Sequence, residues 1–100
     1  MFVNVGRYRF RPMGQDEQQR IVQRIEQDVP PIARESPGFR GVYFARPSHD
    51  ELMAVWLWDS AADWAAALPR FGPSLQEYVV PNLTQPPERV GGEVVVQVTP

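Results

Sequence analysis

The chain has 100 residues, of which 43% are hydrophobic and 11% aromatic, enough for one hydrophobic core of ordinary domain size. A formal net charge of −2 gives no basic surface of the kind that binds nucleic acid, so we expect no nucleic-acid partner. The absence of cysteine excludes disulfides and thiolate metal sites, and a single histidine leaves a metal only carboxylates. We expect a single domain over residues 1–100 in the cytoplasm, with no membrane partner, because no stretch approaches the roughly 20 apolar residues of a span.

The amino-terminal third predicts one strand and one helix. Residues 2–11 alternate in hydrophobicity with a period of two, which indicates a strand. Apolar residues then recur at helical spacing from Ile21 to Ile32, and Asp16 with Gln19 resembles a capping box before them. Pro30-Pro31 removes two backbone donors, so we expect a kink or a fresh helical start there.

The middle of the chain predicts a hairpin followed by a second helix. Residues 39–46 and 51–59 are rich in β-branched and aromatic side chains, and turn-forming residues separate them. Ser60, with Asp63 three residues later, is expected to cap the second helix. We expect Pro69 and Gly72-Pro73 to break that helix early.

The carboxyl-terminal part predicts a further helical piece and one more strand. Residues 81–92 are rich in proline and glycine and look like a linker. Valine at alternate positions from Val94 to Val98 then predicts the last strand.

The element order β-α-β-β-α-β indicates an α+β protein of the ferredoxin-like type, a split sandwich with both helices on one face of a four-stranded antiparallel sheet. The strands are apolar on both sides, which would leave a large apolar face in water. We therefore expect a homodimer in which a second sheet covers that face. Arg7 and Arg9 fall on the same face, and we expect them to form ion pairs with Glu51 or Glu93 at the interface.

Three segments carry a family resemblance: RYRFRP at residues 7–12, PIARESPGFRG at residues 31–41 and WDS at residues 58–60. On these segments, and over nearly its whole length, the chain resembles the antibiotic biosynthesis monooxygenase family. The resemblance implies a dimeric α+β barrel whose sheets face each other, with a pocket in each subunit between helices and sheet. Members of the family hydroxylate aromatic polyketides without metal or flavin, or degrade haem, and many have no assigned function.

The resemblance argues against haem degradation in this chain. The haem-degrading members use an Asn, a Trp and a His, whose places fall near Gly6, Ala67 and Glu77 here. None of the three matches, although Asn4 and Trp64 lie close to the first two places. Because the residue that would bind iron is absent, we expect no haem, and we expect no flavin or metal cofactor either.

Four residues are candidates for binding a substrate: Asn4, Tyr8, Trp64 and Tyr78. Asn4 interrupts an apolar strand face, where a buried amide needs partners. It could bond to nearby backbone, or it could point into a pocket, with Gly6 leaving room, and bind a carbonyl or phenolate oxygen. The aromatic candidates could form the walls of the same pocket and supply polar tips, or they could simply pack in the core.

These residues leave three functions open. The leading interpretation is a cofactor-independent monooxygenase, or a related small enzyme, that acts on an aromatic or polyketide-like metabolite. The second is a non-catalytic dimeric protein that binds a small molecule in the same pocket. The third is a structural or assembly protein whose pocket is filled by its own side chains. His49 falls in a hairpin turn, where we expect it to be exposed and without a catalytic role.

Overall fold

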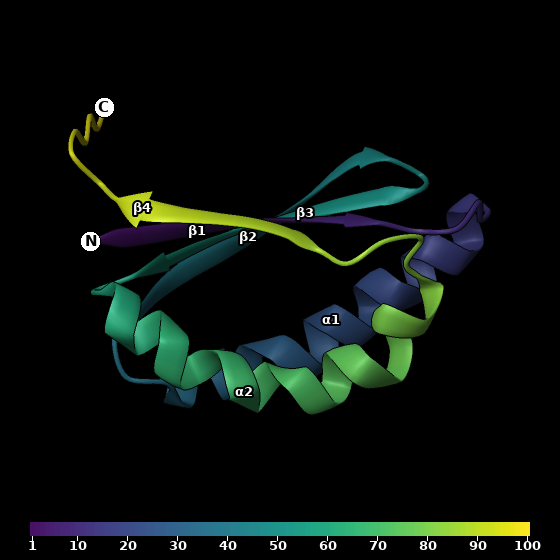
Figure 1. Cartoon of the computed structure of the whole chain (residues 1–100), viewed down its shortest axis with the longest axis horizontal. Helices are drawn as coiled ribbons and strands as arrows, with labels where there is room; N and C mark the ends of the chain where they lie inside the picture. Colours follow the sequence, from purple (N-terminus) through teal and green to yellow (C-terminus); the bar gives the residue numbers. More distant parts are fainter.

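The computed structural model describes every residue from Met1 to Pro100. Both helices lie on one face of a four-stranded antiparallel sheet in the order β2-β3-β1-β4 (Figure 1). The predicted ferredoxin-like architecture is therefore confirmed. The elements in chain order are β1 (Phe2–Arg9), α1 (Gln15–Glu35), β2 (Phe39–Ser48), β3 (Glu51–Trp58), α2 (Ala61–Tyr78), the short 3₁₀-helix η1 (Val80–Asn82) and β4 (Glu88–Glu93).

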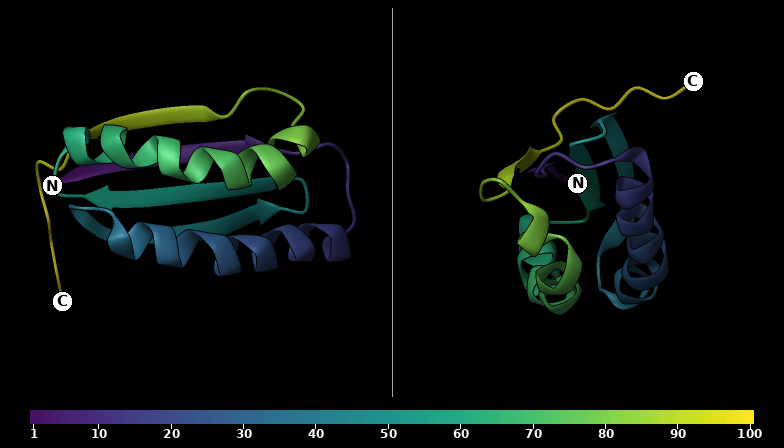
Figure 2. Two further views of the ribbon diagram at one scale, coloured as in Figure 1. Left: turned by 90° about the horizontal axis from the view of Figure 1, so that it is seen from below. Right: turned by 90° about the vertical axis from the view of Figure 1, so that its right-hand side faces the viewer.

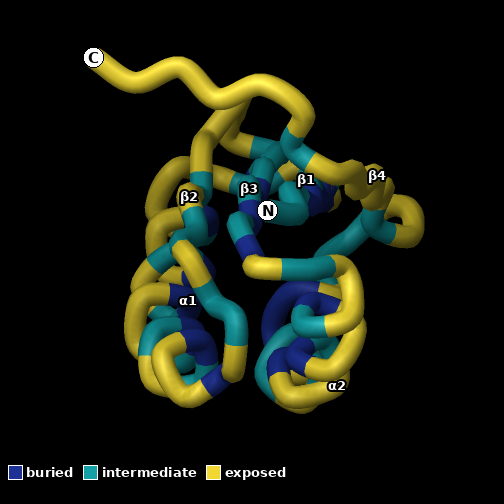
Figure 3. The backbone as a smooth tube through the Cα atoms, turned by 90° about the vertical axis from the view of Figure 1, so that its left-hand side faces the viewer, coloured by how far each residue is buried: buried dark blue, intermediate teal, exposed yellow.

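The core lies between the helices and the sheet, as the sequence pattern predicts. Alternate residues of β3 from Leu52 to Trp58 are buried against the helices, whereas the residues between them are only partly covered. Ile25 and Val29 of α1 face the same space. Figure 3 shows that the buried parts of α1 and α2 face the sheet and each other, whereas their outer sides are exposed.

Both helices run through their prolines, so the predicted fresh start at Pro30-Pro31 and the predicted break at Pro69 are wrong. Each proline leaves the carbonyl four residues earlier without its helical partner. For Pro30 and Pro31 those carbonyls belong to Glu26 and Gln27, which are exposed. For Pro69 and Pro73 in α2 they belong to Ala65 and to Pro69 itself, which are exposed as well. Water can satisfy the carbonyls on the outer side of each helix. No helix combines the length and apolarity that crossing a membrane requires.

The two helices begin differently. Ser60 caps α2 as predicted, and its hydroxyl accepts a hydrogen bond of 3.1 Å from the Asp63 amide. The expected capping box at Asp16 and Gln19 is wrong, because α1 already begins at Gln15 and its first residue follows Gly14, which has no side chain to cap with. Asp16 instead lies in the first turn, where its charge complements the helix dipole.

The last strand lies earlier in the sequence than expected. β4 occupies Glu88–Glu93, and all of it except Glu93 falls in the segment that looked like a linker, whereas residues 94–98 form no strand. The pairing of β4 with β1 depends on Gly91, because a Cβ there would come within 2.5 Å of the Phe2 ring. β4 therefore forms at residues that include two glycines and have low strand propensity, because these residues can pack closely against β1.

The face of the sheet away from the helices has an apolar part and a charged part. Strand pairing aligns one apolar residue from each strand in a single row. Its two edge members are 69% and 70% exposed. No other part of this chain covers the row. From β2 to β4 its members are Tyr43, Val55, Val5 and Val90.

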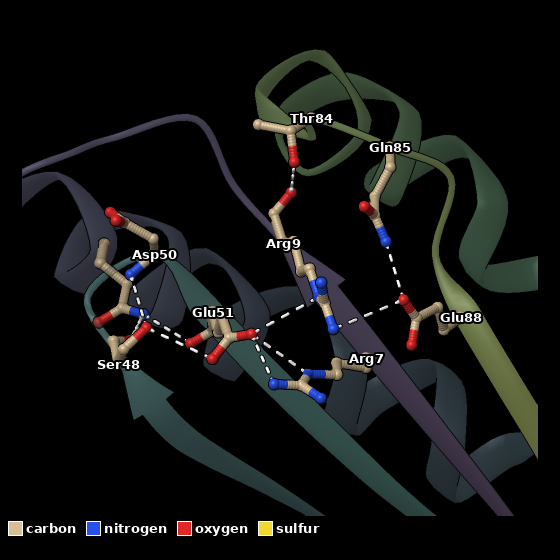
Figure 4. Close-up of polar contacts among 9 residues, drawn as sticks. Arg7, Arg9, Ser48, Asp50, Glu51, Thr84, Gln85 and Glu88 are labelled. Carbon is tan, nitrogen blue, oxygen red and sulfur yellow. Dashed lines mark hydrogen bonds and ion pairs between the residues drawn. The ribbon is translucent and has the colours of Figure 1, made fainter.

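The charged part lies toward the β2–β3 turn (Figure 4). Arg7 donates a hydrogen bond of 2.7 Å to the Glu51 carboxylate, and Arg9 lies 3.6 Å from the same group. Arg9 also lies 3.7 Å from Glu88. The expected pairing with Glu51 is thus present within one chain, whereas the pairing with Glu93 is not.

Candidate functional site

Asn4 is a buried amide without a hydrogen bond on the helix-facing side of β1. It lies between Trp56 of β3 and Gly91 of β4 and is 6% exposed. Its Oδ1 atom is fully buried and has no partner. The Gly91 backbone comes close to the amide, since a Cβ at position 91 would lie 3.1 Å from Asn4 Nδ2. The structure therefore does not show the backbone hydrogen bonds that would explain Asn4 as an ordinary core residue.

A second polar atom on the same face is also unpaired. Trp58 Nε1 is buried without a partner, and Trp58 lies on β3 two residues beyond Trp56, the strand partner of Asn4. An unpaired acceptor and an unpaired donor on neighbouring strands are complementary to a hydroxyl group, which can both donate and accept.

Trp64 joins these strands through an aromatic cluster. Its ring centroid lies 5.3 Å from that of Trp56 and 5.7 Å from that of Trp58, and Phe71 contacts Trp56 at 4.9 Å. Trp64 projects from the first turn of α2, which Ser60 holds at the end of β3. These rings form an apolar wall, next to Asn4, against which a flat molecule can pack.

Tyr8 lies on the same strand face as Asn4, four residues further along β1. Its ring leans back over Gly6, so that a Cβ at position 6 would lie 3.3 Å from the Tyr8 hydroxyl. Tyr8 lines a hollow of about 260 Å³ that is open between α2 and β4. Arg89 lines the same hollow and stands opposite Gly6 in the strand pairing.

Arg89 is the residue that sequence reasoning misses. It forms no ion pair, and the hollow contains no carboxylate and no histidine. An unpaired guanidinium beside a tyrosine hydroxyl can bind an anionic oxygen. No sequence signal marks Arg89, because its place depends on the register of β4.

A second cavity lies deeper, between both helices and the sheet. Its volume is about 20 Å³, and all of its lining is apolar. A space of this size and character is no larger than a water molecule and stays dry. Tyr8, Leu75 and Val79 line both this cavity and the 260 Å³ hollow, so they form the wall between the two.

Tyr78 faces a different place, a groove of about 780 Å³ along α1 that also includes Arg24 and Asn82. Its hydroxyl is buried without a partner, and the Arg24 guanidinium lies 4.6 Å from its ring centre. Burial raises the pKa of Tyr78 to about 12; Asp28 and Glu77 add to the increase, and Arg24 opposes it. The hydroxyl is therefore protonated, and a hydrogen-bond donor, at every physiological pH.

The structure thus brings Asn4, Tyr8 and Trp64 together between the sheet and the helices, whereas Tyr78 lines the α1 groove. Figure 2 shows α1 and α2 side by side over this face of the sheet. Tyr8 and Tyr78 line different ones of the three main hollows, and Asn4 and Trp64 line none of the three. The convergence of these four residues on one ligand stays a prediction.

The side chains of this chain do not provide a ligand set for a metal ion or for haem iron. No three histidine or acidic side chains lie close enough together to hold a metal ion. Glu77, at the place of the iron-binding histidine, lies on the surface and pairs with Arg24 at 3.4 Å. The residues present do not fit a haem group.

Comparisons with known proteins identify the fold. No protein-family model matches the chain, and no curated protein matches it. Among solved structures, the monooxygenase ActVA-Orf6 of Streptomyces coelicolor, in complex with nanaomycin D, is 23% identical, with a TM-score of 0.77 over 99% of this chain and 91% of that chain. SnoaB, a cofactor-independent oxygenase from Streptomyces nogalater, is 15% identical, with a TM-score of 0.71 over 97% and 95% of the two chains.

A third structure, a dimeric ferredoxin-like protein from an uncultured marine organism, is 14% identical, with a TM-score of 0.75 over 99% and 98% of the two chains. Other matching structures bear the name antibiotic biosynthesis monooxygenase. The resemblance stated from the sequence holds at the level of the fold. This chain has the ferredoxin-like fold of the antibiotic biosynthesis monooxygenases.

Proposed function

We propose that the protein is a cofactor-independent monooxygenase that acts on a flat, phenolic, polyketide-like metabolite. The observation that carries this proposal is the Asn4 amide, which is buried beside the tryptophan cluster without a hydrogen bond. A buried amide without partners lowers stability by about 1–3 kcal/mol. Such a cost is expected where the group serves a ligand rather than the fold.

The substrate enters, in this proposal, through the 260 Å³ hollow between α2 and β4. Tyr8 and Arg89 meet its polar edge there. Displacement of Tyr8 and Leu75 joins the hollow to the inner cavity, whose lining includes Trp56, the strand partner of Asn4. The inner cavity of about 20 Å³ must widen there to admit the ring system.

The chemistry asked of the protein is modest. A phenol that has lost its proton to solvent carries negative charge on oxygen and on a ring carbon, and that carbon can combine with O₂. When a proton returns, the product is a hydroperoxide. Loss of water from the hydroperoxide leaves a carbonyl, so one oxygen atom is incorporated and the other leaves as water. Asn4 Nδ2 and the Arg89 guanidinium donate hydrogen bonds to the phenolate oxygen and so favour the ionised substrate. The aromatic wall orients the ring and excludes water.

We further propose that the protein works as a homodimer. The apolar row from Tyr43 to Val90 is exposed in the single chain, and a second copy of the sheet is complementary to it. A face-to-face pair of sheets would bury an interface in the obligate range of roughly 2,000 Å² or more.

A binding protein without catalysis is the second candidate. The hollow beside Tyr8 is lined by no carboxylate or histidine that could act as a general base. Without a general base, a substrate that does not lose its proton spontaneously would be bound but not oxidised.

Oxygen uptake with a dihydroxyanthrone as probe separates these functions. We expect the wild type to speed oxygen consumption well above the spontaneous rate and Asn4→Leu to lose the effect, while Gln15→Leu, an exposed amide on α1, keeps it. Saturable binding without oxygen uptake would support the binding protein. Neither binding nor uptake would support a pocket filled by its own side chains.

A further inference from the structure

The wall between the 260 Å³ hollow and the inner cavity is closed in this structure, because the inner cavity of about 20 Å³ holds no more than a water molecule. Tyr8, Leu75 and Val79 form that wall. Tyr8 belongs to β1, which is paired on both sides, so its backbone is fixed and only its ring can turn. Leu75 and Val79 lie one turn apart at the carboxyl end of α2. A larger opening therefore requires a movement of α2.

The backbone of α2 is weakened just before that end. Pro69 and Pro73 have no N–H group, so the carbonyls of Ala65 and Pro69 have no helical partner. Gly72 lies between the prolines, and glycine is among the weakest helix formers. The helix thus lacks two of its backbone hydrogen bonds on either side of its most flexible residue.

The side chains of α2 hold the helix on both sides of this stretch but not within it. Before it, Phe71 is 2% exposed, and Arg70 donates a hydrogen bond of 3.0 Å to the Ser36 hydroxyl. After it, the Tyr78 carbonyl accepts a hydrogen bond of 2.8 Å from η1. None of residues 72–77 is buried. The outer side of the helix is exposed (Figure 3), so nothing in this chain opposes an outward movement of residues 72–77.

We propose that residues 72–77 form a gate that moves away from the sheet, takes Leu75 out of the wall and joins the hollow to the inner cavity. The movement costs little, because it breaks few backbone hydrogen bonds and uncovers no fully buried side chain. The opening follows from the backbone of this chain alone. That a flat phenolic molecule passes through it rests on the proposed function.

A thiol inside the inner cavity reports the opening, because the chain has no cysteine of its own. Leu52→Cys places the thiol on β3, where the side chain is 3% exposed and lines the cavity. Val29→Cys on α1 serves the same purpose if the first variant does not fold. The rate at which iodoacetamide reacts with the thiol measures how often the cavity opens. Each thiol variant is then combined with Pro73→Ala, which gives the Pro69 carbonyl its donor back.

Pro73 is exposed and lines neither the hollow nor the cavity, so its replacement changes the helix and not the lining. We expect Pro73→Ala to slow the reaction by at least about tenfold, because proline is far weaker than alanine inside a helix. Pro31→Ala is the matched change at an exposed position of α1 and should leave the rate unchanged.

Three results would overturn the gate. Slowing by Pro31→Ala and not by Pro73→Ala would show that α1 opens instead. Equal rates in all variants would show that the prolines of α2 do not control access. A rate that rises with urea as steeply as global unfolding would show that the cavity opens only when the whole chain unfolds.

Binding of 1,8-dihydroxyanthraquinone, followed by quenching of tryptophan fluorescence, shows what the gate admits. We expect its association rate constant to fall in Pro73→Ala by a factor similar to that of the thiol reaction. An unchanged association rate would show that the ligand enters elsewhere and would overturn the gate as an entrance. If no variant binds the quinone while Pro73→Ala still slows the thiol reaction, the gate is supported and the proposed function is contradicted.

Discussion

The two faces of the sheet are built from the same strands but have different surroundings. On the helix side, alternate residues of β1 and β3 are buried by α1 and α2. On the open side, the apolar row ends in Tyr43 and Val90, which are largely exposed. The chain thus provides its own cover for one face only. The helix-covered face therefore holds the core and the candidate ligand site, and the open face is the proposed surface for assembly.

A charge on the open face should have the largest effect. Val5→Asp puts a carboxylate in the middle of the apolar row, between Val55 and Val90. Burial of an unpaired charge costs several kcal/mol, so we expect dissociation or aggregation. Sedimentation measures the change, with Val80→Asp on η1 as a matched control. A dimer that tolerates Val5→Asp would show that this face is not the interface.

Loss of a large ring on the covered face should instead reduce stability. Trp58 is 0% exposed and packs against Phe39, Trp56 and Trp64. Trp58→Ala should lower the free energy of unfolding by about 3–5 kcal/mol, as measured by denaturant titration. Trp58→Phe keeps most of the volume and removes the unpaired Nε1, so it should cost much less. Equal losses in the two variants would show that the indole nitrogen, not packing, matters.

The raised pKa of Tyr78 makes the free energy of unfolding depend on pH, and the direction of the shift sets the sign of that dependence. Its folded-state pKa of about 12 exceeds the ordinary value of 10.0, so the unfolded chain loses the proton first. The stabilising effect is complete below pH 10 and falls as pH rises toward 12, by up to about 2.7 kcal/mol. Tyr78→Phe should remove this part of the alkaline decline and be nearly neutral at pH 7, because the hydroxyl has no partner. An identical decline in both proteins would place the hydroxyl in water.

The sequence predicts most of this fold because hydrophobic periodicity reflects local burial. The phases of β1 and β3, the hairpin and the Ser60 cap could all be predicted from neighbouring residues. The position of β4 could not, because the valine-rich tail is the better strand by propensity. The pairing depends instead on a contact between Gly91 and Phe2, which are far apart in the chain.

The candidate site follows the same division. Asn4 and Tyr8 could be identified because they share one strand face, and Trp64 because it lies on the inner side of the first turn of α2. Arg89 reaches the site only through the register of β4 with β1. Tyr78 is buried but lines the α1 groove and not the hollow beside Tyr8, since helical phase does not determine which of two hollows a long side chain faces.

Thermal unfolding of Asn4→Ala without ligand tests the central claim most directly, namely that Asn4 serves a ligand and not the fold. The account predicts a midpoint at or above that of the wild type, because the change breaks no hydrogen bond present in the structure and removes an unsatisfied buried amide, together with loss of binding of the dihydroxyanthrone. Asn4→Leu, which keeps most of the side-chain volume, controls for any cavity left by alanine. A midpoint clearly lowered in both variants, by about 4–8 °C for each kcal/mol, would contradict the account and make Asn4 a core residue.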